Sequence, residues 1–351
     1  FRSLLWRQWV GGQAITEQLT AVQALSAYDA IDADSLRLLV ALLPQAKAGL
    51  PLAHALIALS VWLLLRRLLD WRYALVAVSL LVLDPYYMGL SRLLHLDALM
   101  AGLMLVAVLA AAAFARDRHC RYLVIAGVAT GLAVLNRTVA GIGGPFVVAQ
   151  VAIPPIQDAA SRKYNLASWR SRIRSIGIYG LITVATVFML WPAMWQTPLA
   201  TLRELLSLSF GYVDSATETT RFYLGRVVDT PDASFYGLVS LLRSTPLAIL
   251  GCAVALAELW HLRRSVDPSA MARRRLMLGL LAFAFVYTLL ITASDKKYDR
   301  YLLPALLPLC VVAAVGAMGL AERLAHSHLA ATTTLLRSEE RRVGKECRSR
   351  W

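Results

Sequence analysis

The sequence predicts an all-α protein, a polytopic membrane helix bundle with about nine transmembrane helices and interfacial helices on its outer face. Three observations predict this fold class. The 351 residues are 58% hydrophobic and only 17% charged, whereas soluble domains are about 45–50% apolar and about 25% charged. Long apolar segments recur along the chain, and every second loop between them is basic. This composition excludes an ordinary soluble globule, a disordered chain and a collagen-like fibre.

The apolar segments have the length of membrane-spanning helices. A bilayer core about 30 Å thick needs about 20 apolar helical residues, and shorter helices occur where the bilayer thins. The fourth and fifth segments are the shortest. The nine predicted spans are residues 48–65, 73–90, 94–115, 122–135, 139–153, 176–191, 246–261, 276–292 and 301–320.

The formal net charge of +14 comes largely from clusters in alternate loops. Lys and Arg collect in short cytoplasmic loops of membrane proteins. Such clusters follow the first, third, fifth and seventh predicted spans, as nine alternating crossings require. Residues 1–47 and the long loop 194–244 are therefore predicted to be extracytoplasmic. The clusters are Arg66, Arg67 and Arg72; Arg116, Arg118 and Arg121; Arg162, Lys163, Arg170, Arg172 and Arg174; and Arg263, Arg264, Arg273, Arg274 and Arg275.

The rest of the chain divides around these spans. Residues 1–47 read as an interfacial helix with one apolar face, and packing against other parts of the protein is the alternative. Residues 48–193 hold spans one to six, and the loop 194–244 begins with a predicted helix at 198–209. Residues 245–325 hold spans seven to nine, and 326–336 form a cytoplasmic tail. Residues 337–351 resemble a cloning or sequencing scar, the alternative being a basic tail near anionic lipid.

Two features of composition bear on processing and redox chemistry. The chain begins at Phe1 instead of Met, which predicts an N-terminal truncation. The four cysteines share no short spacing, and two of them lie within apolar segments. They therefore indicate neither a zinc site nor a disulfide framework. These cysteines are Cys120, Cys252, Cys310 and Cys347.

Three groups of basic residues break the charge rule, because they lie in loops predicted to be outside. They are Arg92, Arg137 and the trio Lys296, Lys297 and Arg300. Charges on the disfavoured side are costly and so prompt a functional hypothesis. The alternative is that they snorkel from helix ends into water. For Arg137 the sequence favours snorkelling, and for the crowded trio it favours function.

An acidic and a cationic group converge in the segment between predicted spans two and three. Arg92, His95 and Asp97 lie within six residues of one another. Asp97 falls in the first turn of span three, where a carboxylate is stabilised by the helix dipole, and a capping role is the alternative. Asp84, which precedes Pro85, is expected to order a helix break.

The combination of cations and an acid at one membrane face limits the chemistry. Lys and Arg bind phosphate through charge-assisted hydrogen bonds, and a nearby carboxylate can act as a general base on a hydroxyl. This fits an enzyme that cleaves a phosphate-linked donor held by a lipid. It fits equally well a transporter or flippase of an anionic lipid without catalysis.

The sequence resembles the GT-C membrane glycosyltransferases, in the branch of the protein O-mannosyltransferases and the bacterial lipid A aminoarabinose transferases. Four elements carry the resemblance, and they occur in the family's order over most of the chain. They are Asp84-Pro85 with SRLLHLD at 91–97; GLAVLNRT at 131–138, with Arg137 where Lys is common; FYLG at 222–225 with FY at 235–236 and RSTP at 243–246; and KKYDRYLLP at 296–304.

The resemblance implies a specific function for the chain. It implies transfer, with inversion, of a mannose-like sugar from a polyprenyl-phosphate donor to an extracytoplasmic protein or lipid acceptor, in a bacterial plasma membrane and without nucleic acid. No cofactor is implied with certainty; a divalent cation is an open alternative, with no metal ligand assigned.

The resemblance also implies roles for particular residues. Asp97 matches the second acid of the site and is the catalytic candidate in this chain. The family's main catalytic acid follows the first span, which would precede Phe1, and this leaves the activity of the fragment itself an open question. The residues implied in substrate binding are Arg92, His95, Lys296, Lys297, Arg300 and Tyr301.

Overall fold

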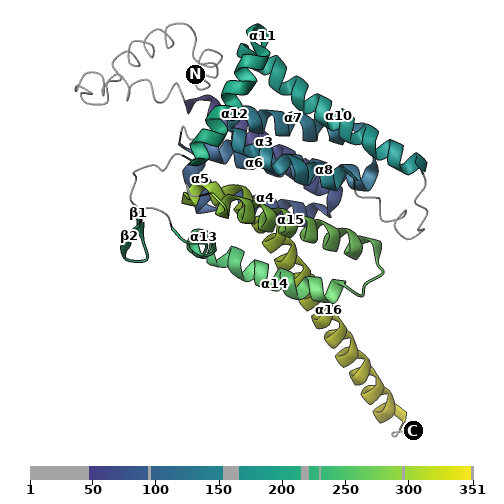
Figure 1. Cartoon of the computed structure of the whole chain (residues 1–351). Coiled ribbons are helices and arrows are strands. Elements are labelled where there is room, and N and C mark those ends of the chain that lie inside the picture. The colour runs from purple at the N-terminus through teal and green to yellow at the C-terminus, as the bar shows by residue number, and fades with distance from the viewer. Residues whose placement is uncertain are drawn as a thin grey trace.

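In the computed structural model the described residues are 47–93, 96–152, 166–214, 221–228, 231–294 and 297–348. They are mostly helical, which confirms the predicted all-α fold class (Figure 1). The described parts of the nine predicted apolar spans are helical apart from the break at Leu83–Asp84 within span two and single residues at span ends. The helices are α3 (Gly49–Leu68), α4 (Trp71–Val82), α5 (Pro85–Ser91), α6 (Leu96–Asp117), α7 (Cys120–Asn136), η1 (Thr138–Gly143), α8 (Gly144–Ala152), α10 (Leu166–Leu190), α11 (Ala193–Gln196), α12 (Pro198–Asp214), α13 (Phe235–Arg243), α14 (Pro246–Leu262), α15 (Pro268–Thr292), η2 (Asp299–Leu302) and α16 (Leu303–Arg348).

Five described helices are long and apolar enough to cross a membrane, and the number rises to seven if each of two bent pairs is one span. The bent pairs are α4 with α5 and α13 with α14. The apolar helices α7 and Thr138–Ala152 are shorter. The protein is thus an integral membrane protein, while the count of nine crossings stays a prediction.

Contacts between helix ends show how the short helices run. Asp97, at the start of α6, pairs with Arg137 directly after α7. Arg118, just beyond the other end of α6, donates to the carbonyl of Val151 near the end of α8 at 3.3 Å. The α7 helix therefore runs the length of α6, and η1 with α8 runs back, as the predicted topology requires.

The α6 helix lies at the centre of the bundle. It is rich in Ala and buried along most of its length, including Leu105 and Leu109. Small side chains allow helices to approach closely where lipid provides no hydrophobic driving force. The helices α3, α7, α8 and α16 pack around it.

Glycines set the closest helix contacts. A Cβ on Gly131 of α7 would lie 2.7 Å from Thr186 of α10, and one on Gly316 of α16 would lie 2.5 Å from the backbone nitrogen of Ala255 in α14. Any larger side chain at either position would push the helices apart. The pairs α7–α10 and α14–α16 therefore depend on these glycines.

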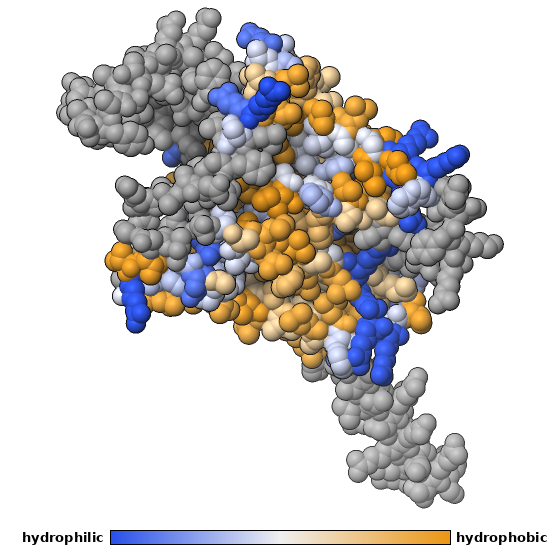
Figure 2. Space-filling view, in the orientation of Figure 1, coloured by the Kyte–Doolittle hydropathy of each residue, from blue (hydrophilic) through white to orange (hydrophobic). Residues whose placement is uncertain are grey.

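Exposed apolar side chains cover the outside of the bundle. Leu181 of α10 is 70% exposed and Phe285 of α15 is also 70% exposed. Figure 2 shows apolar residues over the middle of the visible face, with hydrophilic residues towards its edges. Because large exposed apolar patches are rare on soluble monomers, this surface is the lipid-facing belt of a membrane protein.

Both helix breaks are formed by capping residues. Asp84 accepts a hydrogen bond from the Tyr87 backbone nitrogen at 2.9 Å, which caps α5 and confirms its predicted role. The bend between α4 and α5 is 61°. Thr245 caps α14 in the same way, and α13 turns from α14 by 110°. Pro at the first helical position favours each start.

The long loop between α10 and α14 carries its own secondary structure. It begins with α11 and α12, which confirms the predicted helix at 198–209 and extends it to Asp214. Strands β1 (Arg221–Tyr223) and β2 (Arg226–Val228) form an antiparallel hairpin. Next to it, the side-chain and backbone hydrogen bonds from Ser234 hold the pKa of Asp232 below its usual value.

The two ends of the bundle differ in charge pattern. We call the end with Arg67, Asp117 and the loop between α14 and α15 the basic end. There Arg67 pairs with Asp117 at 2.6 Å, and Arg116 donates to the carbonyls of Arg67 and Leu68. The opposite end, which holds Asp97, is called the Asp97 end.

The two terminal segments differ in how far the structure describes them. Residues 1–46, with the predicted interfacial helix, lie outside the described residues. The α16 helix continues to Arg348, through the predicted tail and into the segment read as a scar. The helix continues without a break at Arg337, where the composition changes.

Candidate functional site

Asp97 is buried at the start of the central helix. Its residue exposure is 0%, although it lies in the first turn of α6 near the end of the bundle. Burying a carboxylate without partners is very costly. The surrounding elements must therefore supply positive charge.

Two arginines supply that charge from different elements. Arg137 Nη1, from the residue after α7, donates to Asp97 Oδ1. Arg300 Nε, from η2, lies 3.3 Å from Asp97 Oδ2. The three side chains come from positions 40 to 203 residues apart, and their formal charges sum to +1. We call Asp97, Arg137 and Arg300 the ionic centre.

Aromatic rings fix the arginines in place. Arg137 Nη2 donates to the Tyr301 hydroxyl at 3.0 Å, and its guanidinium lies 4.7 Å from the centre of the Tyr301 ring. The Arg300 guanidinium lies 4.6 Å from the centre of the Tyr298 ring. Arginine on an aromatic face gains cation–π stabilisation. The ionic centre is therefore built with defined geometry.

The chain around η2 is also tied to the outer loop. Lys297 is only 7% exposed, and its Nζ donates to the Pro231 carbonyl at 2.8 Å. Arg243 at the end of α13 pairs with Asp299 at 2.5 Å. These two contacts hold α13 and the segment before it against η2.

Several buried polar groups lie at this end without hydrogen-bond partners in the described part of the chain. They include the hydroxyls of Tyr86 and Tyr287 and both amide atoms of Asn136. Asn136 directly precedes Arg137. Native structures leave few such groups unpaired, so they mark a region where water or a ligand would complete the bonding.

The structure brings together some, not all, of the residues predicted for the site. Asp97, Arg300 and Tyr301 meet at the ionic centre. Arg92 is exposed as the C-cap of α5, and no ion pair among the described residues joins it to Asp97. Lys297 is three residues from Arg300 in sequence, and its ammonium donates to the Pro231 carbonyl. His95 and Lys296 lie outside the described residues.

The prediction that Arg137 snorkels into water is wrong. Its side chain is 22% exposed and faces the buried Asp97. The cost of leaving that carboxylate unpaired explains why the guanidinium turns inward. Two signals in the sequence pointed to this role: its location on the disfavoured side, and the NRT element at 136–138.

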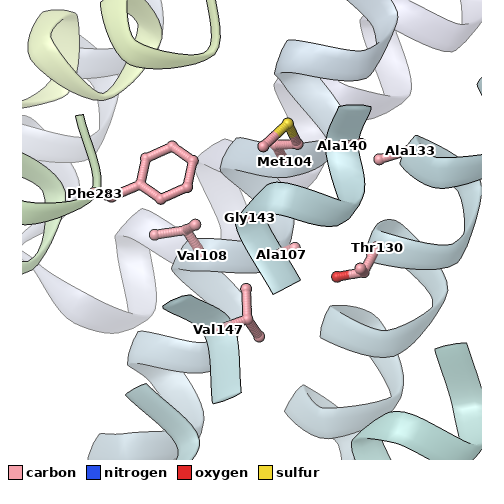
Figure 3. A pocket seen from close by; sticks show the side chains of 9 residues that line it. All are labelled: Met104, Ala107, Val108, Thr130, Ala133, Ala140, Gly143, Val147 and Phe283. Atoms are coloured by element: carbon pink, nitrogen blue, oxygen red, sulfur yellow. The ribbon is translucent and has the colours of Figure 1, made fainter. Parts of the chain in front are cut away.

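The small cavity in the middle of the bundle is a different feature. It has a volume of about 10 Å³, roughly the room for one water molecule. In Figure 3 Thr130 carries the one side-chain oxygen among the nine lining residues, and it accepts a hydrogen bond from Tyr179 at 3.0 Å. Its apolar lining and size do not suit a sugar or a phosphate.

Metal binding has little support from the described residues. No three His, Cys, Asp or Glu side chains converge in that part of the chain, and the oxygens of Asp97 already face arginines. These residues do not fit a divalent-cation site.

The arrangement can bind an anion. Two guanidiniums carry more donors than one carboxylate can accept, and the three side chains together have a formal charge of +1. A phosphodiester carries one negative charge and offers acceptor oxygens in a geometry that arginine matches well. The ionic centre is thus a candidate site for a phosphate group.

Comparisons with known proteins agree with this architecture. The family described as dolichyl-phosphate-mannose-protein mannosyltransferase matches residues 39–195. No curated protein matches the chain significantly. The match includes Asp97 and Arg137.

Two solved structures are similar in fold. ArnT from Cupriavidus metallidurans in the apo state is 19% identical, with a TM-score of 0.51, over 83% of this chain and 50% of that one. The same protein bound to undecaprenyl phosphate is 20% identical, with a TM-score of 0.51, over 78% of this chain and 46% of that one. The chain thus spans about half the length of the structures it matches.

The fold therefore defines the class: this is a polytopic membrane protein with the GT-C fold, as the sequence resemblance predicted. Within that class it is similar to ArnT, a GT-C glycosyltransferase, and its first half matches the mannosyltransferase family.

Proposed function

We propose that the chain is part of a membrane glycosyltransferase that uses a polyprenyl-phosphate-linked sugar. The observation that carries the proposal is the buried Asp97 held between Arg137 and Arg300 at one end of a GT-C fold. One similar structure, ArnT bound to undecaprenyl phosphate, supports the same class of donor. A mannose-like sugar and an extracytoplasmic protein or lipid acceptor follow from the sequence resemblance.

The reaction we propose is one displacement with inversion. The acceptor hydroxyl oxygen attacks the anomeric carbon, the bond from that carbon to the phosphate oxygen breaks, and the lipid phosphate leaves. The phosphate gains negative charge as it leaves, and Arg137 and Arg300 stabilise that charge. The acceptor proton passes to a general base, which the resemblance assigns to the acid that directly follows the family's first span.

The role of Asp97 follows from its surroundings. With 0% exposure and an arginine at each oxygen, it is poorly placed to take a proton from an acceptor. We propose that Asp97 positions the two arginines and lowers the net charge of the centre to +1. We propose this positioning role in place of the catalytic role that the sequence predicted for Asp97.

Loss of donor use tests the proposal. Arg300→Ala and Arg137→Ala should each impair transfer from a synthetic polyprenyl-phosphate sugar far more than folding. Wild-type turnover in both variants would contradict it. Retained lipid-phosphate binding with no transfer of any sugar supplied would favour the alternative, a transporter or flippase of an anionic lipid.

A further inference from the structure

A second polar cavity lies at the basic end, where α14, α15 and α16 meet. It has a volume of about 380 Å³, within the range of small-ligand pockets. The α15 helix separates it from the ionic centre by about 37 Å at 1.5 Å per residue. We call it the basic-end pocket. Its lining residues are Glu258, Leu262, Ser265, Asp267, Ala270, Arg273, Gly319, Glu322 and Arg323.

Ion pairs line the walls of this pocket, and of their four side chains only Glu258 is buried. Glu258 is 5% exposed and pairs with Arg323 at 2.8 Å. Arg273 lies 3.2 Å from Glu322 and donates to the Tyr73 hydroxyl. A Cβ on Gly319 would lie 3.1 Å from Glu258 Oε1, so this glycine leaves room for the carboxylate. The charged groups are held by partners on three helices and α4.

The lining of the pocket carries a net negative formal charge, and we call the exposed Arg263 and Arg264, which lie in the chain between the lining residues Leu262 and Ser265, its rim. The lining holds three carboxylates and two guanidiniums, which leaves one formal negative charge. Both rim arginines directly follow α14. A ligand that pairs with the lining carboxylates and with these arginines must carry a positive and a negative group close together.

Residues next to the pocket in the chain have the character of a membrane interface. Trp260 is 63% exposed, and the Arg263 guanidinium lies 3.3 Å from the centre of its ring. Exposed tryptophan and arginine at a helix end are typical of the membrane interface. Phospholipid headgroups are therefore the ligands expected next to this pocket.

We infer that the basic-end pocket binds the headgroup of an aminophospholipid, that is, a primary ammonium two carbons from a phosphate. The ammonium donates hydrogen bonds to the carboxylates of the lining, and the phosphate pairs with the arginines of the rim. This site does not depend on the proposed glycosyltransferase activity. It would make the stability of the protein sensitive to lipid composition.

The test uses the full chain, purified in detergent, with native mass spectrometry and thermal unfolding as readouts. Phosphatidylethanolamine should bind as a retained 1:1 adduct and raise the unfolding midpoint. Phosphatidylcholine should bind at least about tenfold more weakly, because its quaternary ammonium has no N–H to donate. Soluble phosphoethanolamine should compete, whereas inorganic phosphate should not.

Two variants separate binding from folding. Asp267→Ser removes a carboxylate but keeps a residue able to cap α15, and Ser265→Phe fills the pocket from its loop. Both should weaken phosphatidylethanolamine binding at least about tenfold. The controls are Ser265→Ala and Asp70→Ser, the latter at the cap of α4 outside the pocket.

Three results would overturn the inference. These are equal binding of the ethanolamine and choline lipids, competition by inorganic phosphate alone, and unchanged binding in both pocket variants. If transfer activity were absent but the lipid preference present, only the proposed function would fail.

Discussion

At the scale of single residues, the buried Asp97 determines what the site can do. A carboxylate with 0% exposure is stable in its ionised form only because Arg137 and Arg300 face it. The same contacts hold both guanidiniums at the end of the bundle, with their remaining donors available to an anion. Asp97 thus acts through the arginines.

Replacing either arginine should weaken donor binding. We expect Arg137→Gln to lower kcat/KM for a polyprenyl-phosphate sugar by about 10- to 150-fold, because a hydrogen bond to a charged group contributes about 1.5–3 kcal/mol. Steady-state transfer assays with the lipid-linked donor check this. The matched control is Arg66→Gln, an exposed arginine at the basic end, and equal losses in both would contradict the assignment.

Replacing Asp97 should affect both stability and transfer. In Asp97→Asn two arginines lose their counter-charge, and removal of one partner from a buried pair costs about 3–5 kcal/mol. We expect a lower unfolding midpoint in detergent and strongly reduced transfer, with the protein still inserted in the membrane. An Asn variant with normal transfer would leave Asp97 a capping residue.

The site roles of single residues stay predictions, yet the structure brings together two residues that the sequence singled out. Arg300 was noticed because it breaks the charge pattern, and Asp97 because it falls in the first turn of a predicted span beside Arg92 and His95. Arg137 was misread because a lone arginine beside a helix end usually snorkels, and the sequence does not reveal that a buried carboxylate lies 40 positions away. Long-range pairing of this kind requires coordinates.

At the scale of elements, glycine contacts decide which helices pack closely. The Cβ of an alanine at 316 would lie 2.5 Å from the backbone of α14, whereas Gly180 of α10 has nothing within 4 Å. These two positions therefore offer a matched pair of substitutions.

Gly316→Ala should destabilise the protein, and Gly180→Ala should not. Overpacking typically costs about 1–3 kcal/mol, while alanine in an open helix position gains about 0.5–1 kcal/mol over glycine. Thermal unfolding of both variants in the same detergent measures the difference. A stabilised Gly316→Ala variant would mean that α14 and α16 are not in this close contact.

Hydrophobic length predicted the helices well and the breaks less well. Predicted span two proved to be α4 and α5 with a 61° bend, which the Asp84-Pro85 dipeptide had indicated. The 110° bend between α13 and α14 was not predicted, although Thr245-Pro246 carries the same cap-and-proline signal. The contacts of Lys297 and Arg243 with other elements also lay beyond sequence patterns.

At the scale of the whole molecule, the topology makes a direct prediction. Ala233 before α13 and Ser269 at the start of α15 are both exposed, and α14 lies between them. If α14 crosses the membrane, single cysteines at these positions lie on opposite sides.

Impermeant thiol labelling of intact cells tests this in a variant without native cysteines. The Ala233→Cys protein should react, because the loop 194–244 is predicted to be extracytoplasmic. The Ser269→Cys protein should react only after the membrane is opened. Equal labelling of both in intact cells would contradict the predicted orientation.

Binding of a polyprenyl phosphate by the purified chain tests the central claim most directly. We expect the wild-type chain to retain the lipid in native mass spectrometry and the double variant Arg137→Gln with Arg300→Gln to bind it at least about 100-fold more weakly. A double variant at the basic end, Arg66→Gln with Arg72→Gln, both exposed and outside either proposed site, should bind like the wild type. Undiminished binding after loss of both site arginines would show that the ionic centre does not hold the carrier phosphate.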